Sequence, residues 1–485
     1  MDKVVSIHLL HTNDIHSHFD RLGSLYQNVR SLQRSIDERE EPHLLLDIGD
    51  HIDRERLETE GTHGKVNRAV LDRFGYDLIT FGNNELLTVS KAQLNELYQE
   101  APFSVISTNI TEVNTQMRPN WLYEEQIYTL NAIKIGFLAV TIPYEEVYEL
   151  MGWKLGDPLT ILQKKVASFR KQVDIVILLS HLGLQNDDQL ATHIPEIDVI
   201  IGAHTHHLLT QAKRVGNTYM TAAGKFAEHL GHIELQVCPQ TRKLVHVNAA
   251  VIATSSDPKA EPEIDAILSH YKYEAEKTLA EPVCTLSHKM EISWERESPL
   301  GNALVDGIRD WVGTDIALVN SGQILNGLKE GQITRKDLHA ICPHPIHLVK
   351  VALKGQDIRQ ALEESLLEAF YGKKIKGYGF RGDVLGQLCV AGLQVVYQPD
   401  ASAYQKIKRI YVGQALLKDD KIYEVATIDM LTFGVGFTSI QKGAIIKKFL
   451  PGFLREVLAQ HLQNNKKQVV RFDKRYVIEH PGNMR

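Results

Sequence analysis

The first half of the chain alternates short apolar runs with amphipathic stretches. The apolar runs are rich in Val, Ile and Leu, which is typical of strands that are buried on both faces. Between several of them, apolar residues recur at helical spacing. This alternation predicts an α/β domain. The expected strands are Val4–Leu10, His43–Ile48, Asp77–Phe81, Phe103–Ser107, Ile133–Thr141, Val173–Leu179 and Ile197–Ile201, and the expected helices are Leu22–Ile36, Lys65–Phe74, Ser90–Glu100 and Leu159–Lys171.

The second half, from Pro282 onward, shows a similar mixture and predicts a second α/β or α+β domain. Between the halves, Glu263–Ala280 has the periodicity of a helix. We therefore expect a first domain over residues 1–257, a linker helix over 258–281 and a second domain over 282–485. The second half is expected to contain strands at Ile316–Asn320, His347–Leu353, Leu388–Tyr397, Ile407–Val412 and Ile422–Ile428, and helices at Gly301–Val312, Gln356–Phe370 and Pro451–Gln463.

The composition is that of an ordinary globular protein and excludes several classes. The 485 residues are 43% hydrophobic and 24% charged, and no apolar run approaches the ~18 residues that span a bilayer. The net charge of −6 argues against nucleic-acid binding through a general basic field. The four cysteines lie far apart, so neither a disulfide framework nor a zinc knuckle is expected. Because the first residues lack the layout of a signal peptide, we expect a cytoplasmic protein. We also expect a monomer or a small homo-oligomer that acts on a small molecule.

Polar residues with metal-binding chemistry follow five of the expected strands. Because ligand crevices in open α/β sheets lie beyond the carboxyl ends of the strands, these side chains are expected to meet. One histidine after a strand is usually a cap or a surface residue, but five such sites in one domain predict a two-metal centre. The segments are Asp14-Ile15-His16-Ser17-His18, Gly49-Asp50-His51, Gly82-Asn83-Asn84-Glu85, Ser180-His181 and Gly202-Ala203-His204-Thr205-His206.

The order and spacing of these residues resemble the signature of the calcineurin-like metallophosphoesterases, and more narrowly that of the 5′-nucleotidase family. Asn320-Ser321-Gly322 is similar to a motif in the C-terminal domain of that family, so the resemblance covers nearly the whole chain. It implies an N-terminal four-layer αββα metallophosphoesterase sandwich, followed by an α/β (α+β) 5′-nucleotidase C-terminal domain that sets substrate specificity.

The resemblance also implies the metal ligands and the reaction. Two divalent ions (Mn, Zn, Co or Fe) share one carboxylate, and a metal-bound hydroxide attacks the phosphorus in line. One ion is expected to be held by Asp14, His16, Asp50 and His206, and the other by Asp50, Asn83, His181 and His204.

The chain departs from the family at the third motif, Gly-Asn-His-Glu. In the family the histidine of that motif pairs with an aspartate three residues later, whereas this chain has Asn84 and Leu87. Asn84 can donate a hydrogen bond to a phosphoryl oxygen but cannot transfer a proton. His18 is expected to approach the substrate or to lie behind the ligands. Asn84 and His18 are therefore the catalytic candidates.

The second domain also departs from the family. The arginine of the Asn-Ser-Gly-Gly-Ile-Arg motif is missing, since Leu325 stands in its place. Aromatic stacking of a base tolerates sequence change, so Phe380 with Phe433 or Met430 is expected to grip a base. The substrate-binding candidates are Asn320, Gly322, Phe380, Arg381, Met430 and Phe433.

The function expected from the sequence is hydrolysis of nucleotides or related phosphate esters by a dinuclear-metal phosphoesterase of the 5′-nucleotidase type. Two alternatives within the same chemistry are a nucleotide-sugar or dinucleotide pyrophosphohydrolase and a cyclic-nucleotide phosphodiesterase. A third alternative, from a different class, is a nucleotide-binding protein without turnover.

Overall fold

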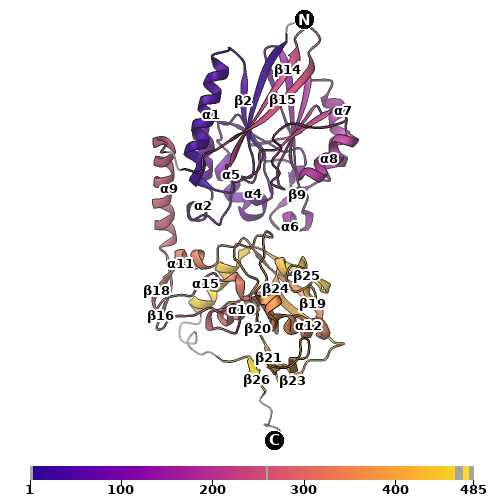
Figure 1. Cartoon of the computed structure of the whole chain (residues 1–485). Helices are drawn as coiled ribbons and strands as arrows, with labels where there is room; N and C mark the ends of the chain where they lie inside the picture. The colour runs from indigo at the N-terminus through magenta and orange to yellow at the C-terminus, as the bar shows by residue number, and fades with distance from the viewer. Residues whose placement is uncertain (1–3, 258–259, 465–472, 480–485) are drawn as a thin grey trace. The chain divides into compact units, whose positions relative to one another are not determined.

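The computed structural model describes residues 4–257, 260–464 and 473–479. The chain divides into two compact units, Met1–Ala275 and Glu276–Arg485 (Figure 1). Helix α9 (Pro262–Leu279) carries the chain from the first unit into the second. It occupies most of the segment expected to be a linker helix, of which residues 258 and 259 lie outside the described residues. Within the described residues, no helix has the length and apolar composition needed to cross a bilayer.

The first unit contains two large sheets. The seven-stranded sheet has the order β15 (Lys243–Ala253), β14 (His229–Cys238), β1 (Val5–Thr12), β2 (His43–Asp47), β3 (Leu78–Ile79), β4 (Ser104–Ile106) and β6 (Leu122–Tyr123). The six-stranded sheet has the order β12 (Lys213–Val215), β13 (Thr218–Thr221), β11 (Val199–Gly202), β10 (Ile175–His181), β8 (Ile133–Thr141) and β7 (Glu125–Leu130). A short antiparallel pair, β5 (Ile110–Glu112) and β9 (Trp153–Leu155), lies apart from them.

The two sheets pack face to face on a buried apolar layer. Alternate residues of β1, such as Ile7 and Leu9, belong to the same core cluster as Phe137 of β8 and Ile177 of β10. Helices α7 (Pro158–Phe169) and α8 (Leu184–His193) cover the outer face of the second sheet, where Phe169 and Leu190 share a second core cluster with strand residues.

The other helices of the first unit complete the layering. Helix α1 packs against the first sheet, on the side of the unit away from α7 and α8 (Figure 1). The expected helix–sheet–sheet–helix sandwich is therefore confirmed. The helices are α1 (Leu22–Asp37), α2 (Leu57–Thr62), α3 (Lys65–Phe74), α4 (Asn83–Thr88), α5 (Lys91–Tyr98) and α6 (Glu145–Leu150), with a 3-10 turn at Phe19–Arg21.

The second unit is a mixed α/β structure around one apolar core. Its five-stranded sheet has the order β20 (Leu388–Ala391), β17 (Ile316–Asn320), β24 (Ile422–Ile428), β19 (His347–Lys354) and β25 (Ala444–Phe453). The smaller sheets are β23 (Ala415–Leu416), β22 (Ile407–Val412), β21 (Leu393–Tyr397) and β26 (Tyr476–Ile478), and the pair β16 (Pro282–Leu286) and β18 (Gly331–Thr334). The helices are α10 (Pro299–Val312), α11 (Arg335–Ile341), α12 (Gly355–Ser365), α13 (Glu368–Tyr371), α14 (Asp429–Thr432) and α15 (Leu454–Asn464), with 3-10 turns at Ser321–Gln323 and Ile440–Lys442.

Three element predictions in the second unit are wrong. The helix expected over Gln356–Phe370 is interrupted at residues 366 and 367, and forms α12 and α13. The apolar run 388–397, expected as one strand, forms β20 and β21, which belong to different sheets. Gly392 separates them with a φ of 73°, and a Cβ there would lie 1.7 Å from the Asp315 carbonyl oxygen, so only glycine fits the corner. The helix expected from Pro451 begins at Leu454, because residues up to Phe453 continue strand β25.

The register of the parallel strands places the polar segments at one edge of the sandwich. Thr12 of β1 pairs with Asp47 of β2, and Asp47 pairs with Ile79 of β3. In the other sheet, Ser180 of β10 pairs with Gly202 of β11. The segments that follow these strands therefore start from neighbouring points.

Candidate metal centre

The loops that carry the predicted ligands are held to one another by backbone hydrogen bonds. The N–H of Asp14 donates to the Gly49 carbonyl over 3.0 Å, and the N–H of His16 donates to the Asp50 carbonyl over 2.8 Å. These loops also have unusual backbone geometry. Left-handed conformations of non-glycine residues are uncommon and concentrate at functional sites. Five of the seven predicted ligands have positive φ, namely Asp14 (51°), His16 (49°), Asp50 (50°), His204 (77°) and His206 (56°).

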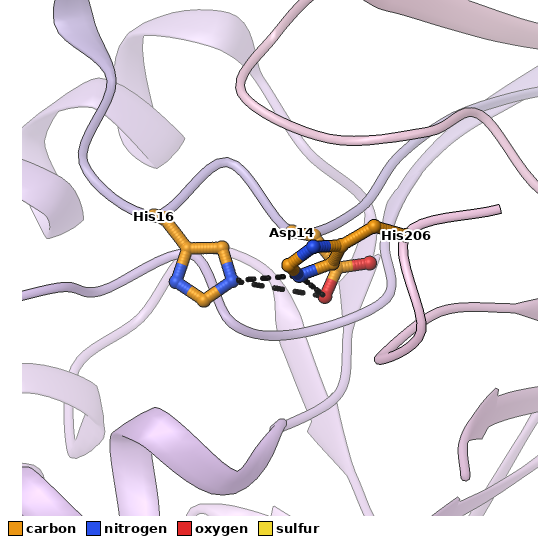
Figure 2. Close-up of side chains that lie close together, drawn as sticks. All are labelled: Asp14, His16 and His206. Atoms are coloured by element: carbon orange, nitrogen blue, oxygen red, sulfur yellow. Dashed lines mark hydrogen bonds and ion pairs between the residues drawn. The ribbon is translucent and has the colours of Figure 1, made fainter. Parts of the chain in front are cut away.

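Asp14, His16 and His206 form the first of two clusters, here called the Asp14 cluster. Figure 2 shows the three side chains pointing toward one another, Asp14 and His16 from the loop after β1 and His206 from the loop after β11. Nε2 of His206 lies 3.6 Å from Asp14 Oδ1 and 3.2 Å from Nε2 of His16. Nε2 of His16 lies 3.9 Å from Asp14 Oδ1. The three ligand atoms surround a space suited to one cation.

Asp50, His181 and His204 form the second cluster, here called the Asp50 cluster. His181 is fully buried, and its Nδ1 lies 2.8 Å from the Ile48 carbonyl oxygen. Because a carbonyl can only accept, this contact places a ring proton on Nδ1 and makes Nε2 the nitrogen that faces the cluster. Nε2 in turn lies 3.4 Å from Asp50 Oδ2.

One carboxylate oxygen stands between the two clusters. Asp50 Oδ2 lies 3.4 Å from Nε2 of His181 and 3.6 Å from Nε2 of His16. Asn83 also fits a metal ligand, because its buried Oδ1 has no hydrogen-bond partner among the described residues, while its Nδ2 donates to Asn84 Oδ1 over 3.2 Å. Imidazole, carboxylate and amide donors in this mixture suit divalent transition metals.

The electrostatics of the centre follow from burying carboxylates beside imidazoles. Burial raises the pKa of Asp14 to about 6. Burial also opposes the ionisation of Asp50, but the neighbouring His181 and His16 outweigh it and hold its pKa below the usual range. Burial and neighbouring histidines lower the pKa values of His204 and His206 to about 4. At neutral pH these two imidazoles are uncharged, the form that binds metals.

Comparison with known proteins agrees with this geometry. Residues 7–208 match the calcineurin-like phosphoesterase family, and residues 280–442 match the 5′-nucleotidase C-terminal domain family. The chain is 37% identical over 457 residues to YunD of Bacillus subtilis (strain 168), an uncharacterized metallophosphoesterase, covering 94% of this chain and 99% of that one. The chain belongs to the calcineurin-like metallophosphoesterases. Members of these families are metal-dependent phosphoester hydrolases, and this phosphoesterase is one as well.

Solved structures share its two-domain fold. A putative 5′-nucleotidase from Staphylococcus aureus matches with a TM-score of 0.69 at 14% identity, over 98% of this phosphoesterase and 100% of that chain. An NAD nucleotidase from Haemophilus influenzae matches with a TM-score of 0.67 at 16% identity, over 99% and 98% of the two chains. At these identities the likeness concerns the fold.

Two carboxylates that the sequence reasoning missed support the ligands of this phosphoesterase. Asp53 is buried, with its Oδ2 3.3 Å from Nδ1 of His16, so it favours the tautomer whose Nε2 faces the cluster. Glu85 is also buried and accepts hydrogen bonds from the backbone N–H groups of Asp50, Ile52 and Gly82. The spacing Asp50-x-x-Asp53 was the available signal for the first of them.

The two catalytic candidates lie beside the Asp14 cluster. The Asn84 side chain has contacts within the protein: its Nδ2 lies 3.0 Å from Nδ1 of His16 and donates to the Ile52 carbonyl over 3.1 Å. The His18 ring is stacked on Phe226, with 3.8 Å between the ring centroids. Burial and the charge of His16 lower the pKa of His18, which favours its neutral form.

Most of the substrate-binding candidates lie inside the second unit. Asn320 is buried, and its Nδ2 donates to the Leu385 carbonyl over 2.6 Å. Gly322 packs so closely that a Cβ would lie 2.1 Å from the Val384 carbonyl oxygen. Met430 is fully buried, with its sulfur 3.6 Å from Nε2 of Gln323. These three residues therefore have packing roles in this structure.

Phe380 is buried as well, although the sequence analysis expected it to stack on a nucleotide base. It is 4% exposed, and its ring stacks on His344 with 5.3 Å between centroids. Arg381, half-buried beside it, donates its backbone N–H to Nδ1 of His344. Phe433 differs, because it is 55% exposed and lies 6.2 Å, between ring centroids, from Tyr378, which is 58% exposed. Tyr378 was missed; its place in Gly377-Tyr378-Gly379 was the available signal.

Proposed function

We propose that this phosphoesterase hydrolyses nucleotides or related phosphate esters at a centre of two divalent ions. The observation that carries the proposal is the position of Asp50 Oδ2, within 3.6 Å of one histidine from each cluster. A carboxylate between two sets of imidazole ligands is what a pair of ions 3.5–4 Å apart requires. The unpartnered Oδ1 of Asn83 adds a ligand that has no other use among the described residues.

We assign the candidate ligands to the two ions in the division that the sequence predicts. Asp14, His16, Asp50 and His206 would hold one, and Asp50, Asn83, His181 and His204 the other. When bound, such ions supply charge neutralisation for the phosphoryl group and activation of a water molecule. The chain itself orients the ligands through Asp53, Glu85 and the Ile48 carbonyl.

The exposed rings of Tyr378 and Phe433 are the best candidates for contact with a base. Two rings that lie 6.2 Å apart and are each more than half exposed offer π-faces to a flat heterocycle. Both aromatic residues lie next to glycines with positive φ: Tyr378 lies between Gly377 and Gly379, and Phe433 precedes Gly434. Each stacking ring contributes ~1–3 kcal/mol to base binding.

The test uses the full-length protein, purified without chelators and reloaded with Mn²⁺ or Zn²⁺. We expect elemental analysis to find close to two ions per chain, and turnover of aryl phosphates and of nucleotides in a panel of mono-, di- and cyclic forms. Asp50→Asn is the control that should lose both properties. Nucleotide binding without turnover in the loaded protein would favour the non-catalytic alternative, and failure to hold any ion would overturn the proposal.

A second measurement tests the proposed base contacts of the second unit separately from the metal centre. Tyr378→Ala and Phe433→Ala should raise KM for nucleotides while leaving KM for an aryl phosphate unchanged. Unaltered nucleotide KM values in both variants would remove these rings from the proposed site.

A further inference from the structure

The loop of residues 222–228, between β13 and β14, lies against the Asp14 cluster. Three hydrogen bonds fasten it to the neighbouring residues 13 and 14. The N–H of Phe226 donates to the Asp14 carbonyl over 2.8 Å. The Asn13 amide donates to the Gly224 carbonyl over 2.7 Å and accepts from the N–H of Ala223 over 3.1 Å. The loop is therefore held in place by the same segment that supplies a metal ligand.

The backbone of this loop is strained where it faces the cluster. Phe226 and Ala227 are consecutive non-glycine residues with φ values of 57° and 55°. Each such residue costs on the order of 1–3 kcal/mol and persists only where its surroundings fix it. The result is a fixed aromatic wall: the Phe226 ring lies 5.8 Å from the ring of His16, 6.0 Å from that of His206 and 3.8 Å from that of His18.

Lys225 places a positive charge on this wall. Its Nζ lies 4.3 Å from the Phe226 ring centroid, and within the described part of the chain no carboxylate lies within ion-pair distance of it. The Lys225 charge reaches the centre, since it contributes to the lowered pKa of His206 after burial and His16. A cation–π contact is worth only ~0.5–1 kcal/mol at an exposed site, which leaves the ammonium available to a ligand.

The Asp50 cluster has a different neighbour. There the Tyr144 hydroxyl lies 3.4 Å from Nε2 of His204, and burial raises the pKa of that phenol, so the side chain is neutral. With two divalent ions bound, an ammonium beside the Asp14 cluster would be repelled unless an anion lay between them. The charge asymmetry therefore points to an anion on the Asp14 side.

We propose that Lys225, with Phe226 and His18 beside it, forms a subsite for a second phosphate group of the substrate, so that this phosphoesterase prefers phosphoanhydrides to simple monoesters. The proposal rests on the proposed function, because the first phosphate is the one held at the dinuclear centre. The ammonium would donate a charge-assisted hydrogen bond to an oxygen of the second phosphate.

The test compares the affinities of the Mn²⁺-loaded full chain for inorganic pyrophosphate and inorganic phosphate by calorimetry. Lys225→Met should weaken pyrophosphate binding by about 10-fold or more, as expected for one lost charge-assisted hydrogen bond, and change phosphate binding less than about 2-fold. Lys225→Arg should retain the affinity for pyrophosphate. Lys134→Met is the matched control, because exposed Lys134 lies at the start of β8, away from the carboxyl ends of the strands.

Three outcomes overturn the proposal. The first two are that Lys225→Met lowers the affinities for pyrophosphate and phosphate equally, or lowers neither. The third is that the protein binds phosphonoacetate more tightly than pyrophosphate, which would assign the subsite to a carboxylate. In kinetics, Lys225→Met should raise KM for a nucleoside diphosphate and leave an aryl monophosphate unaffected. The wild-type protein separates this proposal from the underlying function. If it holds two ions and cleaves the aryl ester while the Lys225 variants behave as wild type, only the subsite is wrong.

Discussion

The first unit contains two groups of buried and partly buried histidines near strand β1, and only one of them is arranged to bind metal. The ladder group lies along the strands: Nδ1 of His8 contacts Nε2 of His232 over 3.0 Å, and Nε2 of His8 contacts the Glu41 carboxylate over 2.9 Å. The centre lies just beyond the end of β1, where Nε2 of His181 and Oδ1 of Asn83 lack hydrogen-bond partners among the described residues. A metal site therefore depends less on the number of histidines than on side-chain ligand atoms that lack other partners and lie close to one another.

The backbone explains the difference between the two groups. His8 and His232 lie within strands, so the pleat sets the direction of their side chains and spaces them along one face. Five of the seven candidate ligands lie in loops after strands and have positive φ, which turns successive side chains inward. The other two are His181, the last residue of β10, and Asn83, the first residue of α4.

The largest expected effect is the loss of the shared carboxylate. Asp50→Asn should lower the metal content from about two ions per chain toward zero and reduce phosphoesterase activity by more than about 100-fold, since even outer-shell changes cost 10–100-fold. Elemental analysis and aryl phosphate turnover measure both. His8→Gln is the control from the ladder group and should keep two ions. Metal loss in His8→Gln would erase the distinction drawn between the groups.

A smaller effect is expected from the carboxylate behind His16. Asp53→Asn removes the charged acceptor that lies 3.3 Å from Nδ1 of His16. The substitution should lower the affinity for one of the two ions about 10–100-fold and leave the affinity for the other unchanged. A metal titration resolves the two affinities. Asp72→Asn, which removes a surface carboxylate paired with Arg68, is the matched control. Equal weakening of both ions would mean that Asp53 acts on the whole centre.

The sequence predicted that these residues would meet, and they form two clusters, because the candidate ligands occur at regular places. Asp14, Asp50 and Asn83 each follow a parallel strand, and parallel strands end at a shared edge. The second unit was harder, because Phe380 and Phe433 look alike in sequence, whereas the former stacks on His344 in the core and the latter is exposed. Lys225 could not be found from spacing, because its loop reaches the centre through hydrogen bonds to Asn13 and Asp14.

A third prediction concerns the stability of strand β1, which carries both His8 of the ladder group and His11. The ring of buried His11 packs on Gly231 of β14, where an added Cβ would lie 2.1 Å from Nε2 of His11. Gly231→Ala should therefore cost about 1–3 kcal/mol of unfolding free energy through overpacking. Chemical denaturation measures the loss. If the folded variant also loses metal, the two groups are mechanically coupled, contrary to the comparison made above.

The smallest expected effect is a loss of folding stability at acidic pH. Burial, and then the charge of His232, lower the pKa of His11 to about 3; burial, and then His8, lower that of His232 to about 4. Both are below the unfolded value of about 6.5. Between those values the unfolded chain binds more protons, so stability is fully present above pH 6.5 and falls as the pH drops toward 4.

Thermal midpoints of the metal-free protein should show this fall. The variant His232→Asn should flatten the fall. Glu234 and Arg39 also act on the pKa of His232, and Glu41 contacts its neighbour His8. An unchanged slope in the variant would place the acid sensitivity in the metal ligands instead.

The position of β1 in its sheet has a consequence for biosynthesis. β1 is made before both of its neighbours in the sheet, β2 on one side and β14 on the other. At 5–20 residues per second, roughly 10–50 s separate the synthesis of β1 from that of β14. His16 and His206 are 190 residues apart, so a nascent chain cannot close the Asp14 cluster until β11 has also emerged. Assembly of this cluster is therefore a late event of folding, and a chain that stalls before β14 has β1 unpaired on one side and exposed to chaperones.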